Sequence, residues 1–312
     1  MKKIISLILV AALFTLVLTG CGSASTTAST TATSTTTTTT EQAAPAETVQ
    51  TEETVPLSGD GIDPNLDYGA LAGQTITIAS APAPHAAILE IARDILAQAD
   101  ITLDIRVFED YVIPNNVVES GEIYANYFQH IPYLEWFNEE YGTHLVNAGG
   151  IHIEPQAIYA GKSSSLEDIP DGAQIAVPAD TTNEARALYL LDSAGLLKLN
   201  PTSDFAATIY DIAENPHNIE FVEIESTQIP NILKDVDFGI IPGNYAIEHG
   251  LNILTDAVFI EGASSAYVNV IAVKEGNENN DLTKALVAAV QSDAVRQHIA
   301  EEFPNGSVVS VF

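Results

Sequence analysis

Arginine is scarce in this chain, and one of its four arginines stands where a ligand carboxylate would bind. Arg186 follows residues 178–185, a segment rich in helix-capping residues between an expected strand and an expected helix. The first turn of a helix presents unpaired N–H groups and a partial positive charge, and an arginine there adds a bidentate clamp for a carboxylate. An ion pair with a nearby acid, Asp180 or Glu184, explains the same residue without a ligand. From these residues alone both interpretations stay open.

Asn244 and a cluster of aromatic residues also stand near the ends of expected strands. Asn244 comes after an expected strand over residues 236–241, and ligands of open α/β sheets bind outside the carboxyl ends of strands. Its amide offers a donor and an acceptor to a zwitterion, with a simple turn asparagine as the alternative. The aromatic cluster consists of Tyr111, Phe128, His130 and Tyr133. These rings form either a packed core or an apolar slot that suits a thioether, since sulfur packs well against ring edges.

The sequence lacks the common motifs of hydrolases, metalloproteases and nucleotide-binding enzymes. It contains no G-x-S-x-G, H-E-x-x-H or P-loop motif, and no G-x-G-x-x-G motif follows the first expected strand. The single cysteine, Cys21, is expected to be lipidated, which leaves no thiol nucleophile. His130, His144 and His152 with an acid could form a metal site, although separately placed histidines are the simpler interpretation. We therefore expect a binding protein without catalysis, cofactor or bound metal.

Hydrophobic periodicity predicts alternating strands and helices that would position these residues. Residues 74–79 and 102–108 alternate as strands do, and residues 86–99 between them have helical spacing. Such strand–helix–strand units indicate an α/β fold with parallel strands and right-handed crossovers. Thr182 or Asn183 is expected to cap the helix that carries Arg186. Further strands are expected over residues 123–127, 153–159, 172–177, 221–224, 236–241 and 267–273, and further helices over residues 114–119, 132–141, 182–194, 229–233 and 282–302.

The N-terminus has the layout of a lipoprotein signal peptide. Lys2 and Lys3 precede an apolar run over residues 4–18, which is too short for a comfortable membrane span. Small residues then lead into Cys21, and the four residues LTGC resemble a bacterial lipobox, in which the cysteine sulfur carries the lipid. Residues 1–20 are therefore expected to be a signal peptide. Lipidation of Cys21 would hold the protein at the outer side of the cell membrane.

A tether and a strong negative charge follow the cysteine. Residues 21–70 are rich in Ser, Thr, Ala, Pro and acids, a composition that buries too little apolar surface to offset chain entropy. The chain has 11 Lys and Arg against 42 Asp and Glu, and its formal net charge is −31. This charge favours solubility and repels phosphate backbones, which argues against nucleic-acid binding.

Several short sequence words together resemble the methionine-binding lipoproteins, the NlpA-type substrate-binding proteins of ABC importers. The likeness runs from about residue 74 to residue 312. The resemblance implies a two-lobed periplasmic-binding-protein fold of type II, with the ligand in the cleft between the lobes. Lobe 1 would comprise residues 71–160 and 268–312, and lobe 2 residues 161–267. The matching words are Pro84-His85, Asp110-Tyr111-Val112, Ala125-Asn126-Tyr127-Phe128-Gln129-His130, Thr182-Asn183-Glu184-Ala185-Arg186, Gly243-Asn244-Tyr245-Ala246 and Tyr267-Val268-Asn269-Val270.

The same resemblance implies roles for individual residues. Arg186 would hold the ligand carboxylate, and Asn183 and Asn244 would help to fix its amino and carboxylate groups. The ligand side chain would be surrounded by Tyr111, Phe128, His130 and Tyr133. The implied function is delivery of methionine to an ABC-transporter permease, with D-methionine and a Gly-Met dipeptide as alternative ligands. A metal- or other-solute-binding lipoprotein of the same fold is a competing hypothesis, and an extracellular enzyme or adhesin on a stalk is another.

Overall fold

The computed structural model describes residues 57–201, 205–262 and 265–312. The predicted signal peptide, the predicted lipidation site Cys21 and most of the predicted tether lie outside the described residues. Within the described ranges, every helix is too short or too polar to cross a membrane.

The last part of the predicted tether is folded. α1 (Tyr68–Leu71) begins after Asp67, whose side chain accepts a hydrogen bond from the N–H of Ala70. Ile62 and Tyr68 are buried in the first hydrophobic core. A few apolar residues are therefore enough to fix this acidic stretch against the rest of the protein, whereas composition alone assigned residues up to 70 to the tether.

The first sheet has six strands in the order β13-β4-β12-β3-β1-β2. β1 pairs in parallel with β2 and β3, whereas β12 runs antiparallel to β3 and β4. All six residues of β3 are buried, as expected for a central strand. The strands are β1 (Thr75–Ser80), β2 (Thr102–Val107), β3 (Ala125–His130), β4 (Leu145–Ile153), β12 (Val268–Lys274) and β13 (Val309–Ser310).

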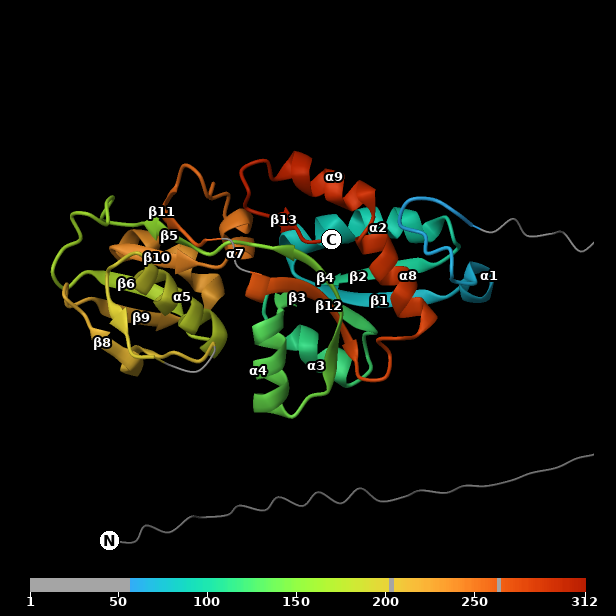
Figure 1. Cartoon of the computed structure of the whole chain (residues 1–312), viewed down its shortest axis with the longest axis horizontal. Coiled ribbons are helices and arrows are strands. Elements are labelled where there is room, and N and C mark those ends of the chain that lie inside the picture. The colour runs from blue at the N-terminus through green and yellow to red at the C-terminus, as the bar shows by residue number, and fades with distance from the viewer. Residues whose placement is uncertain (1–56, 202–204, 263–264) are drawn as a thin grey trace, which may run out of the picture. The chain divides into compact units, whose positions relative to one another are not determined.

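Helices cover both faces of the first sheet, as Figure 1 shows. α2 (Ala87–Ala97), α8 (Asp281–Val290) and α9 (Asp293–Glu302) supply one core, which includes Ile78 of β1. α3 (Ile113–Glu119) and α4 (Ile131–Tyr141) supply the core on the other face, which includes Ala79. Successive residues of a strand point to opposite faces, so the strand serves both cores.

The predicted helix over residues 282–302 is two helices, α8 and α9. α9 begins after Ser292, whose Oγ accepts a hydrogen bond from the N–H of Val295 at 3.2 Å. A serine that caps a helix has an extended backbone, so it interrupts the preceding helix. The apolar periodicity continues across this break, and for that reason the sequence pattern concealed it.

The second sheet has five strands in the order β11-β5-β10-β6-β9. Its strands are β5 (Ala157–Ala160), β6 (Gln174–Pro178), β9 (Glu220–Ile224), β10 (Phe238–Ile241) and β11 (Ala257–Ile260). One core of this sheet contains residues of α5 (Thr181–Ser193), and the other contains residues of α6 (Ile229–Ile232) and α7 (Gly243–Glu248). A short ribbon of β7 (Lys198–Leu199) and β8 (Ile212–Glu214) lies beside it.

The chain leaves the first sheet after β4, through residues 154–156, and returns to it between β11 and β12. β5 pairs with β10, so residues 157–160 belong to the second sheet, whereas the sequence-based division placed them in lobe 1. β4 was not predicted, because Gly149 and Gly150 weaken its strand pattern. A Cβ at Gly149 would approach a Val287 methyl group to 2.8 Å, so close packing against α8 requires this glycine.

Candidate functional site

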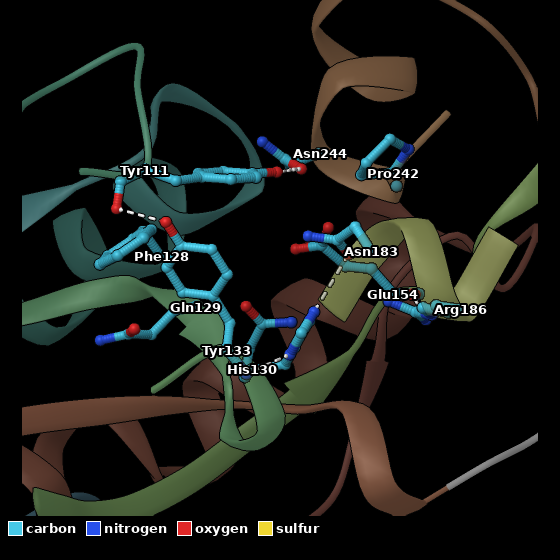
Figure 2. A pocket seen from close by; sticks show the side chains of 12 residues that line it. Tyr111, Phe128, Gln129, His130, Tyr133, Glu154, Asn183, Arg186, Pro242 and Asn244 are labelled. Atoms are coloured by element: carbon cyan, nitrogen blue, oxygen red, sulfur yellow. Dashed lines mark hydrogen bonds between the residues drawn. The ribbon is translucent and has the colours of Figure 1, made fainter. Parts of the chain in front are cut away.

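A pocket with an empty volume of about 350 Å³ lies between elements of the two sheets. Figure 2 shows aromatic rings at one end and polar groups at the other. The structure brings all seven predicted ligand-binding residues into its lining, namely Tyr111, Phe128, His130, Tyr133, Asn183, Arg186 and Asn244.

Asp180 caps the helix that presents Arg186. Its Oδ1 accepts a hydrogen bond from the N–H of Asn183 at 3.0 Å, so the prediction of Thr182 or Asn183 as the cap was wrong. The helix begins one residue earlier than expected, and the carboxylate of Asp180 suits the positive end of the helix dipole. Arg186 then lies in the second turn and is 4 % exposed.

The guanidinium of Arg186 is held in place from several sides. Its Nε donates to Glu261 Oε1 at 2.9 Å, and its Nη2 donates to Glu261 Oε2 at 2.5 Å. Nη2 also donates to the main-chain oxygen of Glu154 at 2.8 Å. The guanidinium carbon lies 4.0 Å from the centre of the Tyr267 ring. The remaining nitrogen, Nη1, forms no hydrogen bond with any residue in the described ranges.

The acids near Arg186 in sequence are not its partners. Asp180 caps the helix, and Glu184 Oε1 accepts a hydrogen bond from the N–H of Ile209 at 3.3 Å. The ion-pair interpretation of Arg186 was right about a carboxylate partner and wrong about its identity, since Glu261 is 75 residues away in sequence.

His130 fixes the orientation of Asn183. The N–H of Tyr133 donates to His130 Nδ1 at 3.2 Å, so the ring proton is on Nε2, which donates to Asn183 Oδ1 at 3.1 Å. Burial first, and Arg186 second, lower the pKa of His130 to about 3, so the ring is neutral near pH 7. Asn183 Nδ2 in turn donates to Asp180 Oδ1 at 2.9 Å. His130 thus contacts the polar end of the pocket as well as its apolar end.

Asn244 presents an unpaired donor to the pocket. The hydroxyl of Tyr111 donates to Asn244 Oδ1 at 2.6 Å, which fixes the amide orientation. Asn244 Nδ2 is buried and has no hydrogen-bond partner among the described residues. Because a buried unpaired donor is costly, this nitrogen is a strong candidate for a ligand contact.

Aromatic rings close the other end of the pocket. The Tyr111 ring stacks on Tyr245 with 5.0 Å between the ring centres. It also lies 5.8 Å from Phe128 and 5.7 Å from Tyr133. The hydroxyl of Tyr133 donates to the main-chain oxygen of Tyr111 at 3.2 Å, which ties the two rings together. The result is an apolar slot with its polar atoms already paired.

The histidines predicted as alternative metal ligands do not converge. His144 is exposed and contacts Glu119, whereas His130 contacts Asn183. His152 is buried and lies against Glu154 and Tyr127 instead.

Five pocket residues received no individual role in the sequence analysis, and these are Gln129, Glu154, Pro242, Gly243 and Asn269. A signal for Glu154 was present, because His152 and Glu154 are two residues apart on an extended segment and therefore share a side. Asn269 stood in a matched sequence word without an assigned role. His85, outside the lining, lies behind both and reaches Asn269 Oδ1 at 3.1 Å.

Comparison with known proteins gives a consistent result. The family model described as NlpA lipoprotein matches residues 76–312. The methionine-binding lipoprotein MetQ of Bacillus subtilis is 38% identical over 78% of this chain and 90% of its own length. Among solved structures, a lipoprotein from Ruminococcus gnavus is 49% identical, covers 76% of this chain and 99% of its own, and has a TM-score of 0.75. A nutrient-binding protein from Burkholderia cenocepacia bound to methionine is 37% identical, covers 76% and 100%, and has a TM-score of 0.73.

Proposed function

Because the chain belongs to the NlpA lipoprotein family, we propose that it is a lipid-anchored solute-binding protein that captures methionine for an ABC importer. The single observation that supports this most directly is the convergence of Arg186 and the unpaired Nδ2 of Asn244 in one pocket with an aromatic slot. A cation and a neutral donor suit a carboxylate, and rings suit a thioether.

The roles of the lining residues follow from their free atoms. Arg186 offers Nη1 and Asn244 offers Nδ2 to the ligand carboxylate. Asn183, held by His130 and Asp180, keeps one N–H and one lone pair for the backbone of the ligand. The thioether would lie in the slot formed by Tyr111, Phe128 and Tyr133.

The two lobes would close on the ligand by a hinge motion. The sequence-based division places residues 71–160 and 268–312 in lobe 1 and residues 161–267 in lobe 2. We propose this division with one change: because β5 pairs with β10, the first boundary lies at residues 154–156. Cys21 would carry the lipid that holds the protein on the extracytoplasmic face of the membrane. The closed form would dock on the permease of the importer, and we expect no catalysis.

Calorimetric titration of the purified protein with L-methionine, D-methionine and Gly-Met tests the proposal. Because such pockets can retain a ligand during purification, small molecules released on denaturation are first identified by mass spectrometry. We expect saturable binding of one methionine isomer at a one-to-one ratio. Binding of a stoichiometric metal ion in place of any amino acid would instead favour the metal-binding alternative.

A further inference from the structure

Glu154 is the one acidic side chain among the described residues that line the pocket. It stands in the segment between β4 and β5 and is 5 % exposed. Burying a carboxylate costs free energy unless hydrogen bonds and an opposite charge compensate it. The groups that surround Glu154 therefore indicate what it is there to bind.

His152 and the main-chain N–H of Asn244 donate hydrogen bonds to Glu154 without bringing a positive charge, and His85 lies close by. His152 Nε2 lies 2.6 Å from Glu154 Oε1, and its Nδ1 lies 2.5 Å from the hydroxyl oxygen of Tyr127. His85 Nε2 lies 3.1 Å from Asn269 Oδ1 and 3.5 Å from Glu154 Oε1. Burial lowers the pKa of His85 to about 4 and that of His152 to about 3, so both rings are neutral near pH 7.

The nearest cation is already paired. Arg186 gives its Nε and Nη2 to the carboxylate of Glu261, and it contacts Glu154 at the main-chain oxygen. The side-chain carboxylate of Glu154 is therefore fixed in position by neutral donors, while no described cationic side chain forms an ion pair with it. A positive charge brought by a ligand would supply what this arrangement lacks.

A metal ion is the other cation to consider. The ligand atoms of His85, His152 and Glu154 all lie within 4.8 Å of one another. Two ligands at about 2.1 Å from one tetrahedral ion are, however, roughly 3.4 Å apart. The 2.6 Å between His152 Nε2 and Glu154 Oε1 is instead the length of a hydrogen bond, so the geometry favours a shared proton over a shared metal.

We propose that Glu154 accepts the α-ammonium group of the bound amino acid while Arg186 holds its α-carboxylate. The proposal rests on the proposed function. Arg186 contacts the main chain of Glu154 directly, so the two charged groups are close enough to bind the two ends of one α-amino acid. His152 and His85 are positioning residues that keep the carboxylate directed at the ligand.

This assignment narrows the class of ligand. A free α-amino acid carries an ammonium group next to its carboxylate. An α-hydroxy acid has a hydroxyl there, and a dipeptide with C-terminal methionine has a neutral amide there. The proposal therefore predicts a strong preference for the free amino acid over both of these compounds.

The test is calorimetry on the full-length chain purified in detergent, with methionine and its α-hydroxy analogue as one pair of ligands and leucine and its α-hydroxy analogue as a second pair. For the wild-type protein we expect the amino acid of the better-bound pair to bind about 10- to 100-fold more tightly than the hydroxy acid. In Glu154→Gln this ratio should fall close to one, because amino-acid affinity drops and hydroxy-acid affinity hardly changes. Glu122→Gln, at an exposed residue between α3 and β3 and outside the pocket lining, should keep the wild-type ratio.

The outcomes separate this proposal from the proposed function. A wild-type protein that selects leucine over its hydroxy acid and ignores methionine contradicts methionine as the ligand and still supports the role of Glu154. A wild-type protein that binds the hydroxy acid as tightly as the amino acid overturns that role, and this measurement needs no variant. An equal loss of both ligands in Glu154→Gln also overturns it, since a purely structural glutamate would give that result.

Discussion

Two glutamates flank Arg186, and they differ in burial and in their partners: Glu154 is buried, whereas the side chain of Glu261 is 14 % exposed. Glu261 forms a bidentate ion pair with the guanidinium. Glu154 receives hydrogen bonds from the neutral imidazole of His152 and from the main-chain N–H of Asn244, and Arg186 contacts its main chain. The comparison teaches that Glu261 completes a charge pair within the protein, whereas Glu154 is prepared for a charge from outside. Sequence distance alone would have suggested the reverse, because Glu154 is much closer to Arg186 along the chain.

Removing the shared cation should have the largest effect. In Arg186→Ala the ligand carboxylate loses its charged donor and Glu261 is left without its partner. We expect methionine affinity to fall by about 100-fold or more, measured by calorimetry. Arg93→Ala, at an exposed arginine paired with Glu90, should leave affinity unchanged. An Arg186→Ala protein that binds normally would remove the basis for comparing the two glutamates.

Removing the neutral donor should have a smaller effect. Asn244→Ala deletes the unpaired Nδ2 and leaves the hydroxyl of Tyr111 without its acceptor. We expect about a tenfold loss of methionine affinity. Tyr111→Phe removes the same hydrogen bond but keeps Nδ2, so its loss should be smaller than that of Asn244→Ala. The opposite order would mean that the Tyr111 hydroxyl, rather than the amide of Asn244, contacts the ligand carboxylate.

Acidification should weaken ligand binding through Glu154. Burial is the largest influence on the pKa of Glu154 and raises it above 4.5, so the carboxylate gains a proton as pH falls through that raised value. Protonation competes with an ammonium ligand, and affinity should therefore decline as pH falls from 7 towards that raised value in titrations at constant ionic strength. The decline should be absent in Glu154→Gln. Other titratable or charged side chains near Glu154 are those of His85, Tyr111, Tyr127, His152, Arg186 and Glu248.

Replacing Glu184, another buried acid, should have the smallest effect. Glu184 lies outside the pocket lining, and burial, together with repulsion from Glu223, raises its pKa to about 7. An acid whose pKa is higher in the folded state loses stabilising protonation as pH rises from 4.5 through 7. Glu184→Gln should therefore unfold at a higher temperature than the wild-type protein at pH 8, with the difference disappearing at pH 5. Methionine affinity should not change, in contrast to Glu154→Gln.

Much of the fold follows from local pattern, because the buried strands and helices have clear periods. β1, α2 and β2 lie within about two residues of their predicted bounds. β4 escaped prediction because close packing against α8 and β12 requires its two glycines. The break between α8 and α9 escaped because a serine cap leaves the apolar period intact.

The site was predictable where chemistry is local and unpredictable where it depends on contacts between distant segments. Arg186 stands near a helix start, and Asn244 follows a strand end, so pattern alone locates both. Glu261, the partner of Arg186, lies 75 residues away, directly after the end of β11, and no spacing rule connects the two residues. His85 and Glu154 meet through the folding of the chain, since they are far apart in sequence and on different segments.

Glu154 stands directly after β4 and Glu261 directly after β11, at the two places where the chain leaves one sheet for the other. A rotation of one lobe relative to the other must twist the chain at these two places. Such a twist would turn both carboxylates at once and change the electrostatic environment of the ligand. Separation of the lobes would thereby weaken ligand binding directly, and ligand release would follow from opening itself.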